Sequence, residues 1–293
     1  MNTSTRLSIH RARPEDKEVV LRFSEHTWEW GDYISLVWGK WLNEPKSRLL
    51  VATKGSTPIA IIHAVMVSRD EGWLEGLRVD PDYRKMGIAG RMTQQGLKEL
   101  EKFGAKVVRF ITSSTNVPIH QIGSKLEFIK IATLRHYEAE AKEGEFSGVS
   151  CPLPSDSTDV IIFVEDSRTF EAMGGLYSTG WRFHAFTPDR IKARLKDGSV
   201  RITGETDNIG AIAFLEEGPY RNALGVAFLD GYVDALPSIL SGIKTEAALS
   251  DHPLVSAWLP DLPKFTEAFS KAGFKTDDEP FWLFEKVIET EEE

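Results

Sequence analysis

The stretch that decides the fold is Val79-Asp-Pro-Asp-Tyr-Arg84-Lys-Met-Gly87-Ile-Ala89-Gly90. It leaves a run of strand type, turns at Pro81 and enters a helix through the pattern Arg84-x-x-Gly87-x-Ala89. Small residues at the start of a helix let a ligand approach the backbone, where the first amides lack acceptors within the helix. With the helix dipole and the cations Arg84 and Lys85, these amides favour a site for a pyrophosphate.

The same stretch is also compatible with an ordinary turn between a strand and a helix, because a single glycine-containing turn says little about a ligand. A dinucleotide-binding fold is disfavoured, since the turn lacks the G-x-G-x-x-G order. The two runs before it, 58–67 and 73–79, are joined by Asp70-Glu71-Gly72, which indicates antiparallel strands in a meander.

Outward from this turn, hydrophobic periodicity predicts alternating strands and helices. Residues 89–103 carry small or apolar side chains spaced by three and four, which predicts a helix that Gly104 ends. Further helices are predicted at 14–26 and 116–125, and strands at 7–10, 49–52, 58–67, 73–79, 107–112 and 128–139.

A similar order of elements is predicted in the second half of the chain. Strands are expected at 159–164, 200–203, 211–215, 223–229, 254–258 and 281–288, and helices at 168–177, 233–249 and 262–272. Residues 144–158 are rich in Ser, Gly and Pro and have no apolar period, so they predict a linker. The sequence therefore predicts a duplicated module, with domains at 1–143 and 159–293.

Composition excludes several classes of protein. Hydrophobic residues make up 41% and charged residues 27% of the 293, as in a globular protein. The net charge of −9 works against a nucleic acid partner, which is bound through many phosphate contacts. The single cysteine, Cys151, excludes an intrachain disulfide. No run of signal or membrane length is found, so we expect a cytoplasmic protein without a membrane partner.

Two motifs resemble those of a known family. Residues 73–89, with Val79-x-Pro81 and Arg84-x-x-Gly87-x-Ala89, resemble the acetyl-CoA-binding motif of the GNAT superfamily of N-acetyltransferases. Asn116 and the later Lys125-Leu126-Glu127-Phe128 are similar to the family's N-x-x-A…K-x-G-F segment. The resemblance covers roughly residues 7–139. The string 73–79, with Gly31-Asp32-Tyr33-Ile34 upstream, is similar to a subgroup that includes histidine N-acetyltransferase-like proteins.

The resemblance implies the GNAT fold, an α/β (α+β) architecture with a mixed, mostly antiparallel sheet flanked by helices, here duplicated in tandem. Its fourth and fifth strands splay apart and hold the pantetheine arm of acetyl-CoA, beside the backbone of Leu77, Arg78 and Val79. No metal is expected. The remaining residues implied for the cofactor are Arg84, Lys85, Met86, Gly87, Ile88, Ala89, Gly90 and Asn116.

In this family the amine attacks the thioester directly, which agrees with a lone Cys151 in the linker. Direct attack needs a neutral amine and a stabilised oxyanion. Glu75 is the candidate base, because it lies on the strand expected to border the thioester. The alternative is that Glu75 binds the substrate ammonium or supports a loop.

One departure from the family pattern concerns the leaving thiolate. Many members place a tyrosine that protonates it three residues before Leu126, where this chain has Gly123. Water, Tyr137 or a group from the second half would then assist, or turnover is weak. Glu127 in place of the usual glycine is a smaller departure.

Acids alternate with aromatics upstream, which suits a cationic amine through ion pairing and cation–π contact. We expect Trp30, Asp32 and Tyr33 near the substrate. Trp38 and Trp41, three apart on a predicted helix, are assigned to packing. A lone histidine, His120, has either a structural role or a place facing the cleft.

The second half lacks the cofactor pattern, and Asp230-Gly-Tyr-Val-Asp234 puts acids where a phosphate would lie. We therefore expect a degenerate GNAT-like domain there. The sequence predicts an acetyl-CoA-dependent N-acetyltransferase for a small, cationic amine or amino acid, acting as a monomer or homodimer. The alternatives are a protein N-terminal or lysine acetyltransferase and a non-catalytic acyl-CoA-binding sensor.

Overall fold

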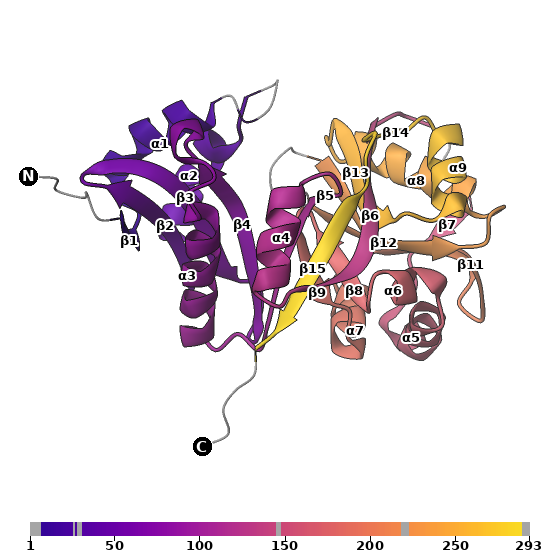
Figure 1. Cartoon of the computed structure of the whole chain (residues 1–293). Coiled ribbons are helices and arrows are strands. Elements are labelled where there is room, and N and C mark those ends of the chain that lie inside the picture. The colour runs from indigo at the N-terminus through magenta and orange to yellow at the C-terminus, as the bar shows by residue number, and fades with distance from the viewer. Residues whose placement is uncertain (1–6, 26, 28–30, 145–147, 218–222, 289–293) are drawn as a thin grey trace, which may run out of the picture. The chain divides into compact units, whose positions relative to one another are not determined.

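The computed structural model describes residues 7–25, 27, 31–144, 148–217 and 223–288 (Figure 1). The chain forms two compact units. The first contains Met1–Phe110, Val117–Ile129 and Phe284–Glu293, and the second contains Ile111–Asn116 and Lys130–Leu283. Each unit thus includes a segment from beyond the boundaries predicted at residues 143 and 158. No helix among the described residues is long and apolar enough to cross a membrane.

The first unit is built on a sheet that begins as an antiparallel meander. Four strands follow one another in chain order: β1 (Leu7–Arg11), β2 (Ser47–Lys54), β3 (Thr57–Met66) and β4 (Glu71–Val79). β5 (Val107–Ser113) then lies parallel to β4. The helices are α1 (Lys17–Ser24), α2 (Ile34–Asn43), α3 (Ile88–Lys102) and α4 (Val117–Lys125).

Two helices of the first unit cover opposite faces of this sheet. On one face, Gly96 of α3 lies so close to Leu74 that a Cβ atom would come within 2.8 Å of it. On the other face, the ring of Trp41 from α2 lies against Gly76, where a Cβ atom would come within 2.5 Å. Trp38 and Trp41 are both buried, which confirms their assignment to packing.

β4 changes its pairing halfway along, and this opens the sheet. Toward β5, the paired residues run only from Glu71↔Val107 to Trp73↔Arg109. Toward β3, the pairs His63↔Glu75 and Ile61↔Arg78 enclose one residue on β3 and two on β4, which is a β-bulge. Gly76 in the bulge has φ +66°, a conformation that favours glycine. The ladder to β5 ends before this bulge, as expected for the splayed strands of the GNAT fold.

The second unit has a similar order of elements, with an additional hairpin. Its sheet runs β6-β13-β12-β11-β10-β7, with β12 and β13 parallel and the other described pairs antiparallel. The strands are β6 (Ile129–Glu140), β7 (Val149–Ser150), β10 (Val200–Glu205), β11 (Asn208–Glu217), β12 (Ala223–Gly231), β13 (Leu254–Pro260) and β14 (Lys275–Thr276). The helices are α5 (Ser157–Glu165), α6 (Arg168–Ala172), α7 (Pro188–Lys196), α8 (Leu236–Leu249) and α9 (Pro263–Lys271), and a hairpin of β8 (Leu176–Thr179) and β9 (Arg182–Ala185) precedes α7.

The last strand of each repeat joins the other unit. β6 pairs with β13 of the second unit from Glu140↔Leu254 to Leu134↔Pro260. β15 (Phe281–Val287) contributes Glu285 to the first unit, where Arg109 Nε donates to Glu285 at 2.7 Å and Arg109 Nη1 donates to Glu71 at 2.8 Å. Because strand partners are not set by chain order, the predicted linear boundaries did not include this exchange.

Three predicted elements of the second half are wrong. Residues 159–164, predicted as a strand, lie in α5, where Val160 and Val164 are buried one helical turn apart. Residues 168–177, predicted as one helix, form α6 and the start of β8, and the predicted linker contains β7 and the start of α5. A short apolar run fits a strand or a helix equally well by periodicity, and packing decides between them.

Candidate active site

The predicted pyrophosphate turn is exposed and its helix begins without a side-chain cap. β4 ends at Val79, a short 3-10 turn follows at Pro81–Tyr83, and α3 begins at Ile88. Gly87 precedes α3 in the left-handed conformation, at φ +74°, and makes no side-chain capping bond. The first amides of α3 therefore face a surface on which a ligand can accept from them. Residues 84–87 are all exposed.

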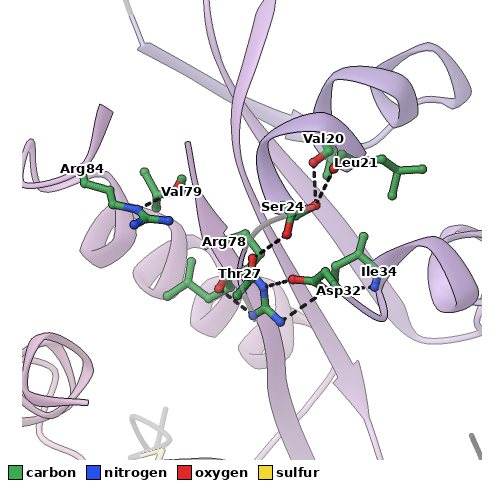
Figure 2. Close-up of polar contacts among 10 residues, drawn as sticks. Val20, Leu21, Ser24, Thr27, Asp32, Ile34, Arg78, Val79 and Arg84 are labelled. Carbon is green, nitrogen blue, oxygen red and sulfur yellow. Dashed lines mark hydrogen bonds and ion pairs between the residues drawn. The ribbon is translucent and has the colours of Figure 1, made fainter. Parts of the chain in front are cut away.

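The side chains around these amides leave room for an anion. A Cβ atom added to Gly87 or Gly90 would meet no atom within 4 Å. The Nε atom of Arg84 donates to the carbonyl of Val79 at 3.2 Å, so the guanidinium folds back toward the end of β4 (Figure 2). Lys85, at φ +62°, is exposed beside it. These observations fit the binding of a pyrophosphate.

β4 supplies the backbone expected beside a pantetheine arm. Leu77, Arg78 and Val79 lie in its stretch that no longer pairs with β5, so their backbone groups on that edge can bond a ligand. The side chain of Arg78 already bonds one of these groups, because its Nη1 atom donates to the carbonyl of Leu77 at 3.0 Å. Its Nε atom donates to Asp32 at 2.7 Å (Figure 2). Its guanidinium lies over the ring of Tyr33 at 5.4 Å.

Asp32 and Tyr33 form a cluster with Arg78, a cation from the same unit, and their predicted place near the substrate stays a prediction. Asp32 also accepts from the amide of Ile34 at 3.0 Å and so caps the start of α2. The Asp32 side chain is only 3% exposed and its charge is balanced by Arg78. Trp30, the third predicted substrate residue, lies outside the described residues.

Glu75, the predicted base, lies in the opened part of β4, two residues beyond the last pair with β5. Its register partner on β3 is His63, so the two side chains are on one face of the sheet. His63 Nδ1 is 2.9 Å from Glu75 Oε1, and His63 Nε2 is 3.7 Å from Glu44 Oε2. Sequence reasoning missed His63 and Glu44, although a histidine inside the apolar run 58–67 was a signal that it has a polar partner.

The region of the usual proton donor is filled by aromatic rings. A Cβ atom on Gly123 of α4 would come within 3.3 Å of Phe110, whose ring stacks on Phe284 at 5.0 Å. Tyr137 is buried in the core of the second unit against Phe269, and its burial raises the pKa of the hydroxyl. A buried hydroxyl of this kind does not suit the proton donor suggested for Tyr137.

Three further predicted positions have local roles in the structure. Asn116 donates to Thr112 Oγ1 at 2.9 Å and belongs to the segment Ile111–Asn116 of the second unit, so its role as a cofactor residue stays a prediction. Glu127 adopts φ +61°, where the family has glycine, and accepts from Lys286 at 2.8 Å, which lowers its pKa. The ring of His120 lies 5.6 Å from that of Phe284.

The corresponding turn of the second unit is built differently. Asp230, at the end of β12, is buried and accepts from the amides of Thr169 and Gly231 at 3.1 and 2.5 Å. Lys264 of α9 pairs with the same carboxylate. Burial has the largest single influence on the pKa of Asp230 and raises it, but these bonds together lower the pKa below its usual value. The turn therefore holds a negative charge at the place where the first unit exposes Arg84 and Lys85.

A family model matches a segment of the chain that lies mostly in the first unit. Residues 17–122 match the model of the acetyltransferase (GNAT) family. The matched segment, which is about a third of the chain, is similar to GNAT acetyltransferases. The chain is an acyltransferase, and GNAT enzymes take their acetyl group from acetyl-CoA. The resemblance to this superfamily is thereby confirmed, whereas the finer subgroup and the nature of the second half stay predictions.

Solved structures share the GNAT fold over nearly the whole chain. The GCN5-related N-acetyltransferase of Sphaerobacter thermophilus is 12% identical with a TM-score of 0.65, over 96% of this chain and 95% of its own. A glucosamine N-acetyltransferase region in a fungal multidomain GH3 β-N-acetylglucosaminidase is 11% identical with a TM-score of 0.63, over 97% of this chain and 38% of its own. The GCN5-related N-acetyltransferase of Kribbella flavida is 14% identical with a TM-score of 0.50, over 98% and 72%.

At these identities the likeness confirms the predicted fold and says nothing about the acceptor. No curated protein matches the sequence. Among the described residues, no group of three or more His, Cys, Asp or Glu side chains is arranged to hold a metal ion.

Proposed function

We propose that this protein is an N-acetyltransferase that transfers the acetyl group of acetyl-CoA directly to the primary amine of a small molecule or an amino acid. One observation carries the proposal. The uncapped start of α3 and the unpaired edge of β4 meet at the turn 80–87, and Glu75 lies on that edge. The same residues thus offer an anion site, a strip of backbone donors and acceptors, and a carboxylate.

Acetyl-CoA supplies an acetyl group as a thioester, which an amine can attack with release of the CoA thiol. The amides at the start of α3, from Ile88 to Gly90, would bind its pyrophosphate, because they have no acceptor within the helix. Arg84 and Lys85 would add positive charge at the same place, and Met86 and Gly87 would line it. The backbone of residues 77–79 would bond the pantetheine amides.

Glu75 would accept the proton that the amine loses. At neutral pH a primary amine is mostly an ammonium ion, which cannot attack a carbonyl until a base removes a proton. The carboxylate is only 9% exposed, so water competes little for it. The second role left open for Glu75, binding of the ammonium, involves the same carboxylate and predicts a different pH dependence. Trp30, Asp32 and Tyr33 are proposed to border the amine, with Asp32 acting through Arg78.

Two alternatives remain with specific support. Gly123, packed against Phe110, offers no proton donor for the leaving thiolate, which favours an acyl-CoA-binding sensor with little turnover. The fold also serves acetylation of a protein N-terminus or lysine. We further propose that residues 159–293 are a degenerate GNAT-like domain, that the nearest subgroup is histidine N-acetyltransferase-like, and that the protein acts in the cytoplasm as a monomer or homodimer.

Thiol release from acetyl-CoA tests the proposal with a panel of histidine, spermidine, glucosamine and an alanine-initiated peptide. We expect turnover with at least one small amine. Glu75→Gln should lower kcat by about 100-fold or more, the range for loss of a general base, while Glu101→Gln on the exposed face of α3 should leave it unchanged. Tight acetyl-CoA binding without thiol release for any amine would favour the sensor, and release with the peptide alone would favour the protein acetyltransferase.

A further inference from the structure

His63 lies in a row of polar groups behind the proposed base, in a strand that is otherwise apolar there. Its side chain is completely buried. The β3 residues on either side, Ile62 and Ala64, are also buried and face α3, where Gly96 contacts both. A buried imidazole is costly unless it is hydrogen-bonded. Packing alone therefore does not explain a histidine at this position.

The hydrogen bond between His63 and Glu75 has a defined direction. An ionised carboxylate only accepts hydrogen bonds, so Nδ1 of His63 carries the proton and donates to Glu75 Oε1 at 2.9 Å. The other ring nitrogen, Nε2, has no hydrogen-bond partner among the described residues. It is 3.7 Å from Glu44 Oε2, which is within the range of an electrostatic contact.

The imidazole is held in this direction by its surroundings. The ring of Trp41 stacks on it, with centroids 4.5 Å apart and planes inclined by 11°. Trp41 can approach β4 only because residue 76 is glycine. The register pair His63↔Glu75 fixes the two backbones opposite each other. The stacking of His63 on Trp41, the register of the two strands and the hydrogen bond therefore all favour one orientation of the Glu75 carboxylate.

Several charged groups share this face of the first unit with the pair. Among the described residues they include Glu44 at the end of α2, the ion pair of Asp32 with Arg78, and the ion pair of Arg109 with Glu71. Arg78 is on the same face as Glu75 because the bulge lies between them, and its guanidinium is bound by Asp32. His63 Nδ1 contacts Glu75 Oε1 directly, at 2.9 Å.

We propose that His63 is a positioning residue for Glu75, which holds one carboxylate oxygen through Nδ1 so that Glu75 stays ionised and keeps one orientation toward the amine. This inference rests on the proposed role of Glu75 as the base. It deepens that role, because it explains how a carboxylate that is nearly buried remains able to accept a proton at neutral pH. A hydrogen bond to the charged form favours that form.

Two substitutions separate the hydrogen bond from the shape of the side chain. His63→Phe keeps a flat ring for Trp41 to stack on and removes the donor. His63→Asn places an amide nitrogen where Nδ1 was and keeps the donor. We expect His63→Phe to lower kcat roughly 10- to 100-fold, as for loss of a group that orients a reacting residue. His63→Asn should retain most of the rate, and the KM for acetyl-CoA should change in neither.

A purely structural role of His63 would leave the pH dependence of kcat/KM unchanged, so this dependence tests the proposal. In His63→Phe the acidic limb of kcat/KM should shift to higher pH, because the ionised carboxylate has lost a donor. Carbon-13 NMR of the ligand-free protein should show the Glu75 carboxyl carbon titrating at higher pH in His63→Phe than in the parent. The signal is assigned by its absence in Glu75→Gln. In His63→Asn both shifts should be smaller.

A double variant distinguishes the failure of this inference from the failure of the proposed function. If Glu75 is the base and His63 acts through it, Glu75→Gln and Glu75→Gln with His63→Phe should have the same kcat within about threefold. If the Glu75→Gln enzyme kept its normal activity, Glu75 would not be the base and the proposed function would fail. A strongly impaired Glu75→Gln enzyme combined with unchanged rate and pH profile in His63→Phe would overturn the positioning role alone. Thermal melts and acetyl-CoA calorimetry show that each variant is folded.

Discussion

The two units share a backbone plan and differ in what they place on one face of it. β4 in the first unit and β12 in the second each carry a β-bulge, and each pairs with its parallel neighbour over only a few residues. In the first unit the pairs on the two sides of the bulge are His63↔Glu75 and Ile61↔Arg78. In the second they are Leu215↔Val226 and Phe214↔Phe228.

The second unit fills the face opposite its long helix with aromatic rings. Phe186, which follows the hairpin of β8 and β9, lies 4.8 Å from Phe214 and 5.1 Å from Phe228. Ser178 of β8 also donates to the carbonyl of Ala227 in the bulge, at 3.3 Å. The first unit keeps Glu75, His63 and the Asp32–Arg78 pair on its corresponding face. The bulge is therefore a property of the fold, and the polar groups beside it belong to the unit proposed to be catalytic.

Carboxylates with little exposure sharpen this comparison, because the second unit has Glu216 as well as Asp230. Glu216 of β11 accepts from Arg194 at 2.7 Å. Burial raises the pKa of Glu216 to about 7 from 4.5, and the nearby guanidinium offsets only part of that effect. Glu75 instead accepts from the ring of His63. If Glu216 serves stability only, its titration should alter unfolding and leave catalysis unchanged.

The largest effect we predict is therefore on the stability of the second unit as a function of pH. A carboxyl group with a raised pKa in the folded state stabilises that state below its unfolded pKa, and the contribution is lost as pH rises through the folded value. As the pH rises from 4.5 to 7, the free energy of unfolding should therefore fall by about 3 kcal/mol. Urea unfolding at pH 5 and pH 8 should show this loss in the parent and not in Glu216→Gln. An equal pH dependence in both proteins would contradict the assignment.

Substitution in the two bulges should have a slightly smaller and unequal effect. Gly76→Ala forces a side chain into a left-handed conformation and against Trp41, for which we expect a loss of about 2 to 3 kcal/mol in the free energy of unfolding. Ala227→Gly in the second bulge should cost about 1 kcal/mol or less. Chemical denaturation of both variants tests this. Equal losses would mean that the bulges are interchangeable and that Trp41 does not constrain the first.

The sequence allowed the elements of the first unit to be predicted because their signals are local. The turn after Val79, the period of residues 89–103 and the meander before them are all set by neighbouring residues, and each lies within a few residues of its predicted place. Helix α7 has equally local signals in Thr187-Pro188-Asp189, an N-cap, a proline and an acid, and we overlooked them.

The parts that could not be predicted depend on contacts between distant residues. Asp32 is paired with Arg78, 46 positions away, and an acid among aromatics looks the same in sequence whether its partner is a substrate or an arginine. His63 acquires its role only through the register of β3 and β4. The exchange of β6 and β15 between the units is a choice of strand partner that periodicity does not contain.

The smallest effect we predict concerns the turns that follow the fourth strand in each unit. Arg84→Glu replaces an exposed cation beside the uncapped start of α3, so the affinity for acetyl-CoA should fall roughly 10- to 100-fold, or about 1.4 to 2.7 kcal/mol. Asp230→Asn, in the corresponding turn of the second unit, should leave that affinity unchanged. Isothermal titration calorimetry with each variant measures both.

The outcome at Asp230 tests the comparison more directly than the outcome at Arg84. Its carboxylate is bound by Lys264 and two backbone amides, so the donors of this turn already have an acceptor from the chain itself. If Asp230→Asn gained a second binding event for acetyl-CoA, the acid alone would be what excludes the cofactor from the second unit. If it gained none, as we expect, the aromatic side chains around Phe228 exclude it as well, and the two units differ in their cores as much as in their turns.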